Sequence, residues 1–226
     1  MELLFNNPIV GLSVSILGYG IGAWVKKKTG SSLANPLAIG SILVILLINL
    51  SPLSLESYQV GGSILTMFLV PVTTILALYI YEQWRLLKEN AIPVLCGCVS
   101  GSVASIVSVV VLCRVFNIEE ALTASLLPKS VTTAIALELS ETVGGLVPIT
   151  VSAVILTGIM SAVASPIIIK TLRLDDPIAI GTAIGTSGHA IGTARALEYG
   201  KTEGAMSSIA LVLSAVITSS LFVVFY

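Results

Sequence analysis

Six apolar stretches of about 20 residues constrain this chain more than any other feature of its sequence. They occupy residues 8–25, 33–50, 61–81, 91–113, 146–169 and 204–226, with short polar loops between them. A helix of about 20 residues is long enough to cross the hydrocarbon core of a bilayer. The pattern therefore predicts an all-α, polytopic membrane protein with about six transmembrane helices.

The composition agrees with lipid as the surrounding solvent. Of 226 residues, 55% are hydrophobic and 10% are charged, and the mean hydropathy is +1.03. A soluble domain carries about 25% charged residues, so this chain cannot cover a surface that faces water. We expect residues 1–226 to form one integral membrane domain. The net charge of -1 gives no reason to expect a nucleic-acid partner.

Metal and cofactor sites are not expected. The chain has a single histidine, and its three cysteines (Cys96, Cys98 and Cys113) fall in one apolar stretch. A zinc site needs several Cys or His ligands that converge, and free cysteines in such a stretch usually act as small apolar residues. No nucleophile-elbow motif is present either, so we do not expect an enzyme.

Two further segments, 119–140 and 176–199, are moderately apolar and interrupted in the middle. Pro128 interrupts the first, and the polar run 185–189 interrupts the second. Each arm is too short to cross a bilayer, so each segment is either a discontinuous crossing or a re-entrant hairpin. With Lys26–Lys28 in the cytoplasm, only the re-entrant arrangement also places Lys170 and Arg173 there. The positive-inside rule therefore favours two re-entrant hairpins that enter from opposite faces.

The second half of the chain also repeats itself. Residues 119–170 and 175–226 each begin with an acidic pair and continue through a broken segment to a full span. Both second arms carry a T-A-x-A-L-E motif, at 133–138 and 193–198. Opposed hairpins would make this an inverted-topology repeat, which is typical of secondary transporters, while residues 1–118 would hold the first four spans. The alternative is that small-residue membrane helices resemble one another by composition.

The first break is a candidate anion site. Lys129, Ser130, Thr132 and Thr133 lie at the start of its second arm. The first turn of a helix has free N–H groups and a partial positive charge, and Lys129 adds a full one. Ionisable residues inside a membrane are usually functional, so we expect a carboxylate to bind here. The alternative is that Lys129 extends to the membrane surface.

The second break offers Ser187, His189, Thr193 and Arg195 as further binding residues. Arg195 is suited to bind a carboxylate through two hydrogen bonds, or else to pair with Glu198 or Glu138. His189 titrates near neutral pH, so it is either a carrier of a coupling proton or a structural histidine.

Three more polar residues are candidates for lining the same path. Thr73 and Thr74 follow Pro71 much as Thr132 and Thr133 follow Pro128, and Asn49 lies near the end of the second stretch. The alternative for such residues is hydrogen bonding between helices.

Both breaks carry long motifs that resemble one bacterial family. Residues 126–133 read L-L-P-K-S-V-T-T, and residues 185–198 read G-T-S-G-H-A-I-G-T-A-R-A-L-E. Both motifs resemble the LrgB/CidB family of membrane proteins, which includes antiholin-like proteins and is related to the plastidal glycolate/glycerate translocator. The likeness covers essentially the whole chain.

This resemblance implies two possible functions. One is a secondary transporter of small monocarboxylates of the pyruvate, glycolate or glycerate class, which works by alternating access of an elevator type. The architecture also suggests a homodimer in the bacterial inner membrane. The other is a holin/antiholin-like regulator of murein hydrolase export and autolysis, which acts with a small partner of the LrgA/CidA type.

The chain departs from the family pattern near both breaks. Ala134 stands where the family usually has proline, and Ser187-Gly188 stands where it has a small residue followed by serine. Moving the hydroxyl by one residue turns it by about 100° around a helix. The departures therefore bear on substrate choice and coupling.

Overall fold

The protein is described by a computed structural model over residues 7–30, 34–68, 71, 74, 78, 81–82 and 84–225. Within these ranges every regular element is a helix. The chain divides into two compact units, Met1–Ile75 and Leu76–Tyr226. The all-α class predicted from the sequence is confirmed.

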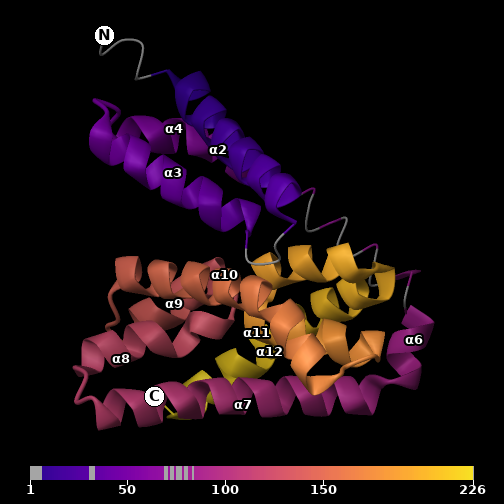
Figure 1. Ribbon diagram of the computed structural model, residues 1–226. Helices are drawn as coiled ribbons and strands as arrows, with labels where there is room; N and C mark the ends of the chain where they lie inside the picture. Colours follow the sequence, from indigo (N-terminus) through magenta and orange to yellow (C-terminus); the bar gives the residue numbers. More distant parts are fainter. Residues whose placement is uncertain are drawn as a thin grey trace. The chain divides into compact units, whose positions relative to one another are not determined.

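The first unit contains α2 (Pro8–Thr29), α3 (Pro36–Leu50) and α4 (Leu55–Thr66) (Figure 1). The second contains α6 (Trp84–Glu89), α7 (Ala91–Val115), α8 (Glu120–Leu126), the 3-10 helix η1 (Leu127–Ser130), α9 (Thr133–Thr142), α10 (Val147–Leu172), α11 (Pro177–Tyr199) and α12 (Lys201–Phe225).

In the first unit, polar caps and glycines explain where the helices begin and how they pack. The side chains of Asn7, Asn35 and Ser54 accept backbone N–H groups at the starts of α2, α3 and α4. A Cβ on Gly18 of α2 would lie 3.2 Å from the carbonyl oxygen of Gly40 on α3. The absence of side chains at these positions lets the two backbones approach closely.

Four helices of the described residues are long and apolar enough to cross a membrane, namely Pro8–Thr29, Ala91–Val115, Val147–Leu172 and Lys201–Val223. The second expected span, α3, has 15 residues and is about 22 Å long, against a hydrocarbon core of about 30 Å. The expected span at 61–81 lies partly outside the described residues. The chain is a multi-pass membrane protein, and the count of six spans stays a prediction.

The first broken segment folds back on itself. After η1 the backbone is extended at Val131 and Thr132, and α9 then begins. Ser125 on α8 and Ser140 on α9 are 15 residues apart, yet both lie against Gly145. A Cβ at Gly145 would be 3.1 Å from the Ser125 nitrogen and 3.1 Å from the Ser140 oxygen. α8, η1 and α9 therefore form a helical hairpin, here called hairpin 1.

The second broken segment also folds back. The helical path of α11 is interrupted at His189, whose φ is 40° and ψ is -135°. A Cβ on Gly192 would lie 2.8 Å from the Ile184 carbonyl oxygen, although eight residues of a straight helix span about 12 Å. Ile180 and Ala196 likewise belong to one core cluster. Residues 177–188 (the first arm) and 190–199 (the second arm) therefore form hairpin 2.

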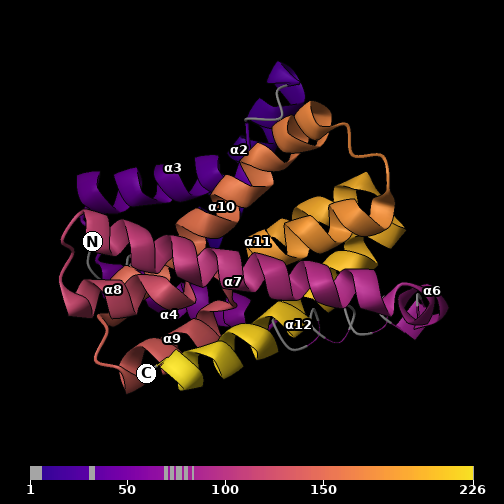
Figure 2. The same cartoon turned by 90° about the horizontal axis from the view of Figure 1, so that it is seen from below.

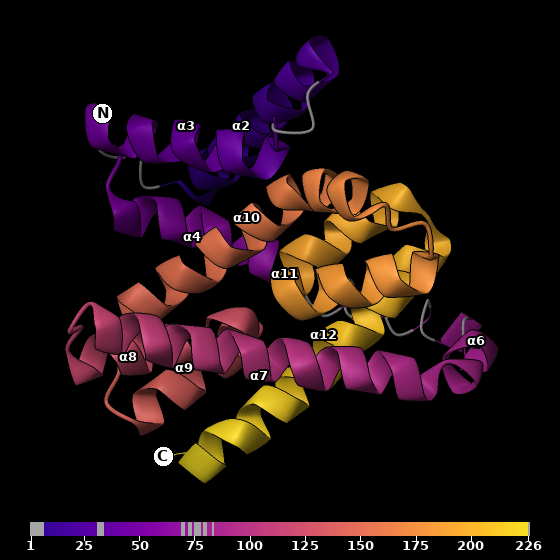
Figure 3. The ribbon, with the colours of Figure 1, turned by 60° about the horizontal axis from the view of Figure 1, so that its bottom comes forward.

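The two hairpins approach the middle of α7 from its opposite ends. Hairpin 1 follows the C-terminal end of α7 in the chain, and its tip reaches back to Ser105. The first arm of hairpin 2 runs beside α7 in the same direction, from the N-terminal end of α7 toward its middle. A Cβ on Gly97 would lie 3.1 Å from the Thr182 methyl carbon, and one on Gly101 2.6 Å from that of Thr186. Figures 2 and 3 show α7 running beside both hairpins. The inverted repeat across a membrane stays a prediction.

The two breaks meet on α10. Val131, in the first break, packs in a core cluster with Val154, Ala136 and Ala215. His189, in the second break, hydrogen-bonds the backbone carbonyl of the same Val154 through its Nε2, at 2.9 Å. One residue of α10 therefore holds the tips of both hairpins together.

Candidate binding site at the two helix breaks

The first break presents a cation and several backbone groups outside a regular helix. Pro128 has φ -83° and ψ 15°, which takes the chain out of the helical path, as proline there predicts. Thr132 is the N-cap of α9, but its side chain makes no capping hydrogen bond. The N–H groups at the start of α9 therefore have no cap from that side chain.

Lys129 points from this break toward α7. Its Nζ donates to the Ser105 hydroxyl at 3.3 Å, and the residue is half-buried. Within the described part of the chain, no carboxylate lies within 4.0 Å of it. A partly buried cation without a counter-ion is unfavourable, so this position is suited to bind an anion reversibly.

Ser130 adds a second unsatisfied group beside Lys129. The residue is 5% exposed, and its hydroxyl has no hydrogen-bond partner in the structure. A buried hydroxyl without a partner is costly, by about 1–3 kcal/mol. The first break therefore holds a cation and a hydroxyl that both lack a strong partner.

At the second break, by contrast, the side chain and the carbonyl of His189 are both hydrogen-bonded. Because a carbonyl oxygen only accepts, His189 Nε2 carries the proton that it donates to Val154. Thr193 Oγ1 lies 2.9 Å from the His189 carbonyl and 2.9 Å from the Ser207 hydroxyl of α12. Gly158 leaves room for the ring, since a Cβ there would lie 2.7 Å from His189 Cε1. The positive φ of His189 is rare for a residue with a side chain, and these contacts hold it.

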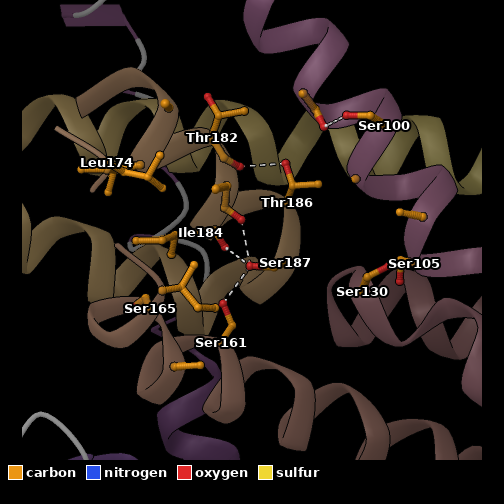
Figure 4. Close-up of a pocket in the computed structure, with 18 of the residues that line it drawn as sticks. Ser100, Ser105, Ser130, Ser161, Ser165, Leu174, Thr182, Ile184, Thr186 and Ser187 are labelled. Atoms are coloured by element: carbon orange, nitrogen blue, oxygen red, sulfur yellow. Dashed lines mark hydrogen bonds between the residues drawn. The ribbon is translucent and has the colours of Figure 1, made fainter. Parts of the chain in front are cut away.

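A cavity of about 1160 Å³ lies in front of both breaks (Figure 4). Its walls come from α7, η1, α10 and the first arm of hairpin 2. Along α7 it extends from Asn90 to Ser108, a distance of about 27 Å at the helical rise per residue. Among the described residues that line it, Lys129 and Asp176 are the ionisable ones. Asp176 directly precedes the first arm, whereas Lys129 lies toward the Ser108 end.

Beyond Lys129 the space between α7, hairpin 1 and α12 is filled. Ile106, Val109, Cys113, Leu127 and Phe222 form one apolar core cluster there, here called the apolar plug. Leu127 is 2% exposed and directly precedes Pro128. The cavity therefore ends near the first break, and tightly packed side chains separate it from the C-terminal end of α7.

Comparison with known proteins assigns the chain to a family. A model of the LrgB-like family matches residues 15–226. The antiholin-like protein LrgB of Bacillus mycoides (strain KBAB4) is 37% identical over 213 residues, which cover 94% of this chain and 93% of that relative. Proteins of the same name from Bacillus cereus (strain B4264) and Bacillus anthracis (strain CDC 684 / NRRL 3495) show the same identity and coverage. The chain belongs to the LrgB-like family.

The resemblance inferred from the two motifs is thereby confirmed. No solved structure matches the chain. In this LrgB-like protein, the first motif covers the tip of hairpin 1, and the second covers the tip and most of the second arm of hairpin 2. Lys129 and Ser130 of the first motif and Thr186 and Ser187 of the second line the cavity.

The cavity brings together only some of the residues that the sequence singled out. Lys129, Ser130 and Ser187 line it. Thr132 and Thr133 are half-buried at the start of α9 and are not among the lining residues. His189 and Thr193 are buried and are not among the lining residues. Their part in binding stays a prediction.

Arg195 lies on the second arm, away from the lining residues. It pairs with Glu198, one of the two acidic partners weighed from the sequence, and its guanidinium lies 5.1 Å from the ring of Tyr199. Its Nε is buried without a hydrogen-bond partner. A direct contact between Arg195 and a carboxylate stays a prediction, and it requires the arginine to leave Glu198.

The sequence also named three residues in the first half of the chain as candidates for lining a path. Asn49 is exposed on α3, and its amide donates to the Ile45 carbonyl at 2.8 Å. Thr74 is exposed and helical, and Thr73 lies outside the described residues. Their role stays a prediction.

Sequence reasoning missed the contribution of α7. Ser105 hydrogen-bonds Lys129. Gly97 and Gly101 leave room for the methyl groups of Thr182 and Thr186 on the first arm. Gly97, Gly101 and Ser105 recur every four positions, and Ser108 follows within one more turn, so small residues mark one helical face. This stripe was the available signal, and it identifies the face of α7 that lines the cavity.

Metal ligands do not gather in the described part of the chain. No group of three or more His, Cys, Asp or Glu residues there is placed to hold a metal ion. The site offers hydroxyls, backbone groups and one lysine, which suit a small anion and hydrogen-bonding ligands.

Proposed function

We propose that this LrgB-like protein carries small monocarboxylates across the bacterial inner membrane by alternating access. The observation that carries this proposal is Lys129, a half-buried cation at a helix break that faces a cavity and has no carboxylate partner among the described residues. An intramembrane cation in such a place marks a site for an anionic ligand.

The charge of the cavity favours a monoanion. Of its described ionisable residues, Lys129 alone is positive, and Asp176 lies toward the other end. One bound carboxylate would neutralise Lys129, whereas a dicarboxylate would leave a second charge uncompensated. The hydroxyls of Ser105 and Ser130 are placed beside the lysine to bond a carboxylate. Pyruvate, glycolate and glycerate all fit this description.

The two ends of the site differ, as alternating access requires. The cavity extends to Asn90, just before α7, and the apolar plug fills the space toward the other end of that helix. Lys88 is close to Asn90 in the sequence, Lys170 and Arg173 are close to the lining residues Ile169 and Leu174, and the positive-inside rule predicts that all three are cytoplasmic. In this proposal the structure is an inward-facing state, and transport requires the plug to open.

A second candidate is regulation of murein hydrolase export, as a holin/antiholin-like protein with an LrgA/CidA-type partner. The observation in its favour is the printed name of the relatives, antiholin-like protein LrgB, at 37% identity over most of both chains. This candidate requires an effect on autolysis that depends on the partner. It does not require saturable flux of a carboxylate.

Uptake into proteoliposomes separates the two candidates. We would measure labelled pyruvate, glycolate and glycerate with wild type, Lys129→Ala and the control Lys170→Ala, which removes an exposed lysine outside the cavity lining. Saturable uptake that is lost in Lys129→Ala and kept in Lys170→Ala would support the carrier. Absence of uptake from folded protein would reject it and favour the regulator.

A further inference from the structure

The first arm of hairpin 2 ends inside the cavity wall at a small group of oxygen atoms. Its last helical residues precede His189, where the helical path is interrupted. The C-terminal end of a helix carries a partial negative charge, and the carbonyls of Ala183 and Ile184 lie in the last two turns of this arm. Ser187 lies in this last turn and lines the cavity. Figure 4 shows its hydroxyl at the centre of several short contacts.

These contacts bring more oxygen atoms together than there are protons to share. The Ser187 hydroxyl lies 2.8 Å from the Ala183 carbonyl oxygen and 3.4 Å from that of Ile184. It also lies 2.9 Å from the Ser161 hydroxyl of α10. Each serine hydroxyl has one proton, so these four oxygens share two hydroxyl protons. The group, here called the serine cluster, is therefore rich in acceptors.

The local sequence explains why these oxygens meet. Ser161 lies against Gly188, where an added Cβ would come 2.5 Å from its hydroxyl oxygen. A side chain at 188 would therefore displace Ser161. This chain has serine at 187 and glycine at 188, which is the departure from the family motif noted in the sequence. The departure both places a hydroxyl on the cavity side and leaves room for Ser161 to reach it.

We propose that the serine cluster binds a monovalent metal cation of about the size of Na⁺. Neutral hydroxyl and carbonyl oxygens at the C-terminal end of a half-helix are the ligands that transporters offer to Na⁺. A divalent cation such as Ca²⁺ or Mg²⁺ usually needs carboxylates, and the described acidic residue of the cavity, Asp176, precedes the opposite end of the arm. The ligands are Ser161 Oγ, Ser187 Oγ and the carbonyl oxygens of Ala183 and Ile184.

The cation site and Lys129 line the same cavity, on different walls. A cation bound to the first arm would add positive charge to the space that an anion enters, and the anion would in turn favour the cation. This coupling rests on the proposed function, whereas the cation site itself does not. Na⁺ and the carboxylate are therefore expected to enter together.

Thermal unfolding in detergent tests the site without transport. We would compare NaCl, KCl, LiCl and choline chloride at equal concentration for wild type, Ser161→Ala, Ser187→Ala and Ser187→Thr. The control is Ser100→Ala, because Ser100 also lines the cavity but bonds only its own helix at Gly97. We expect NaCl to raise the midpoint of wild type by roughly 2 °C or more relative to choline chloride.

The variants decide whether this shift belongs to the serine cluster. Both alanine variants should lose the shift, while Ser100→Ala and the hydroxyl-preserving Ser187→Thr should keep it. No cation-specific shift in wild type, an equal shift in the alanine variants, or a shift from KCl in place of NaCl would overturn the proposal. Ser187→Thr keeps the test valid where an alanine variant fails to fold.

Uptake then separates the two proposals. Replacing Na⁺ by choline should lower carboxylate uptake by wild type about fivefold or more. Uptake by Ser187→Ala should be the same in Na⁺ and in choline. Uptake that ignores Na⁺ would overturn the coupling but leave the carrier standing. A Na⁺ shift that depends on Ser161, in a protein without uptake, would support the cation site and reject the carrier.

Discussion

The two helix breaks occupy equivalent places in the two hairpins but differ in how their polar groups are satisfied. At the first break, Lys129 has a single hydroxyl partner and Ser130 has none. At the second, the ring and the carbonyl of His189 are both bonded, to Val154 and Thr193. The unsatisfied groups at the first break are suited to bind an anion, whereas the satisfied groups of His189 are suited to hold the second break in place.

The largest effects are expected from matched substitutions at the two breaks. Lys129→Met removes a charge that pairs with no carboxylate, so thermal stability should stay the same or rise by up to about 1 kcal/mol. Uptake should fall on the order of 100-fold, because a charge-assisted hydrogen bond contributes about 1.5–3 kcal/mol. His189→Leu should instead lower stability by about 1–3 kcal/mol, since the Val154 carbonyl loses its donor.

Unfolding midpoints and uptake rates on the same preparations check both variants. Lower stability in Lys129→Met would mean that the lysine holds the first break together. The assigned difference between the breaks would then be wrong.

The next effect concerns the space that holds the second break. Gly158→Ala would place a Cβ 2.7 Å from His189 Cε1 and 2.9 Å from Ile191 Cβ, so we expect a loss of about 1–3 kcal/mol. Gly20→Ala is the control, because nothing lies within 4 Å of the added atom on α2. It should be neutral or stabilising by up to about 1 kcal/mol. Equal behaviour of the two variants in thermal unfolding would show that His189 can move freely.

A smaller effect is expected from the hydrogen bonds behind the second break. Thr193→Val keeps the shape of the side chain but removes the bonds to the His189 carbonyl and to Ser207, which is fully buried. Stability should fall by about 1–2 kcal/mol, while the affinity for the carboxylate stays unchanged. Thr142→Val, at an exposed end of α9, should stay within about 0.5 kcal/mol of wild type. A changed affinity in Thr193→Val would extend the binding site to the second break.

Local sequence predicted the breaks better than it predicted their surroundings. Proline interrupts the hydrogen bonds of a helix, so Pro128 made the first break predictable from the sequence. The run 185–189 contained the second break, at its last residue His189. The contact of Lys129 with Ser105 could not be predicted from the sequence, because it joins residues 24 positions apart on separate helices.

Arg195 shows the same limit from the other side. From the sequence, Arg195 had three possible partners: a bound carboxylate, Glu198 or Glu138. In the structure it pairs with Glu198, three residues away on the same arm. Neighbours on one helix surface were therefore visible in the sequence. The direction in which the second arm faces was not, since it depends on the reversal at His189 and on the packing of α12.

The smallest effect would sharpen the role of α7 in the first break. Ser105→Ala removes the described partner of Lys129 Nζ and leaves the lysine in the cavity wall. A neutral hydrogen bond contributes about 0.5–1.5 kcal/mol, so the KM for the carboxylate should rise about 2–10-fold with little change in kcat. Ser108→Ala is the control, because Ser108 lines the same cavity but bonds the Ser105 carbonyl of its own helix. If both variants keep the wild-type KM, Lys129 binds its anion without help from α7. If both raise it equally, the whole face of α7 forms the site, and the first break would no longer be the place where affinity is set.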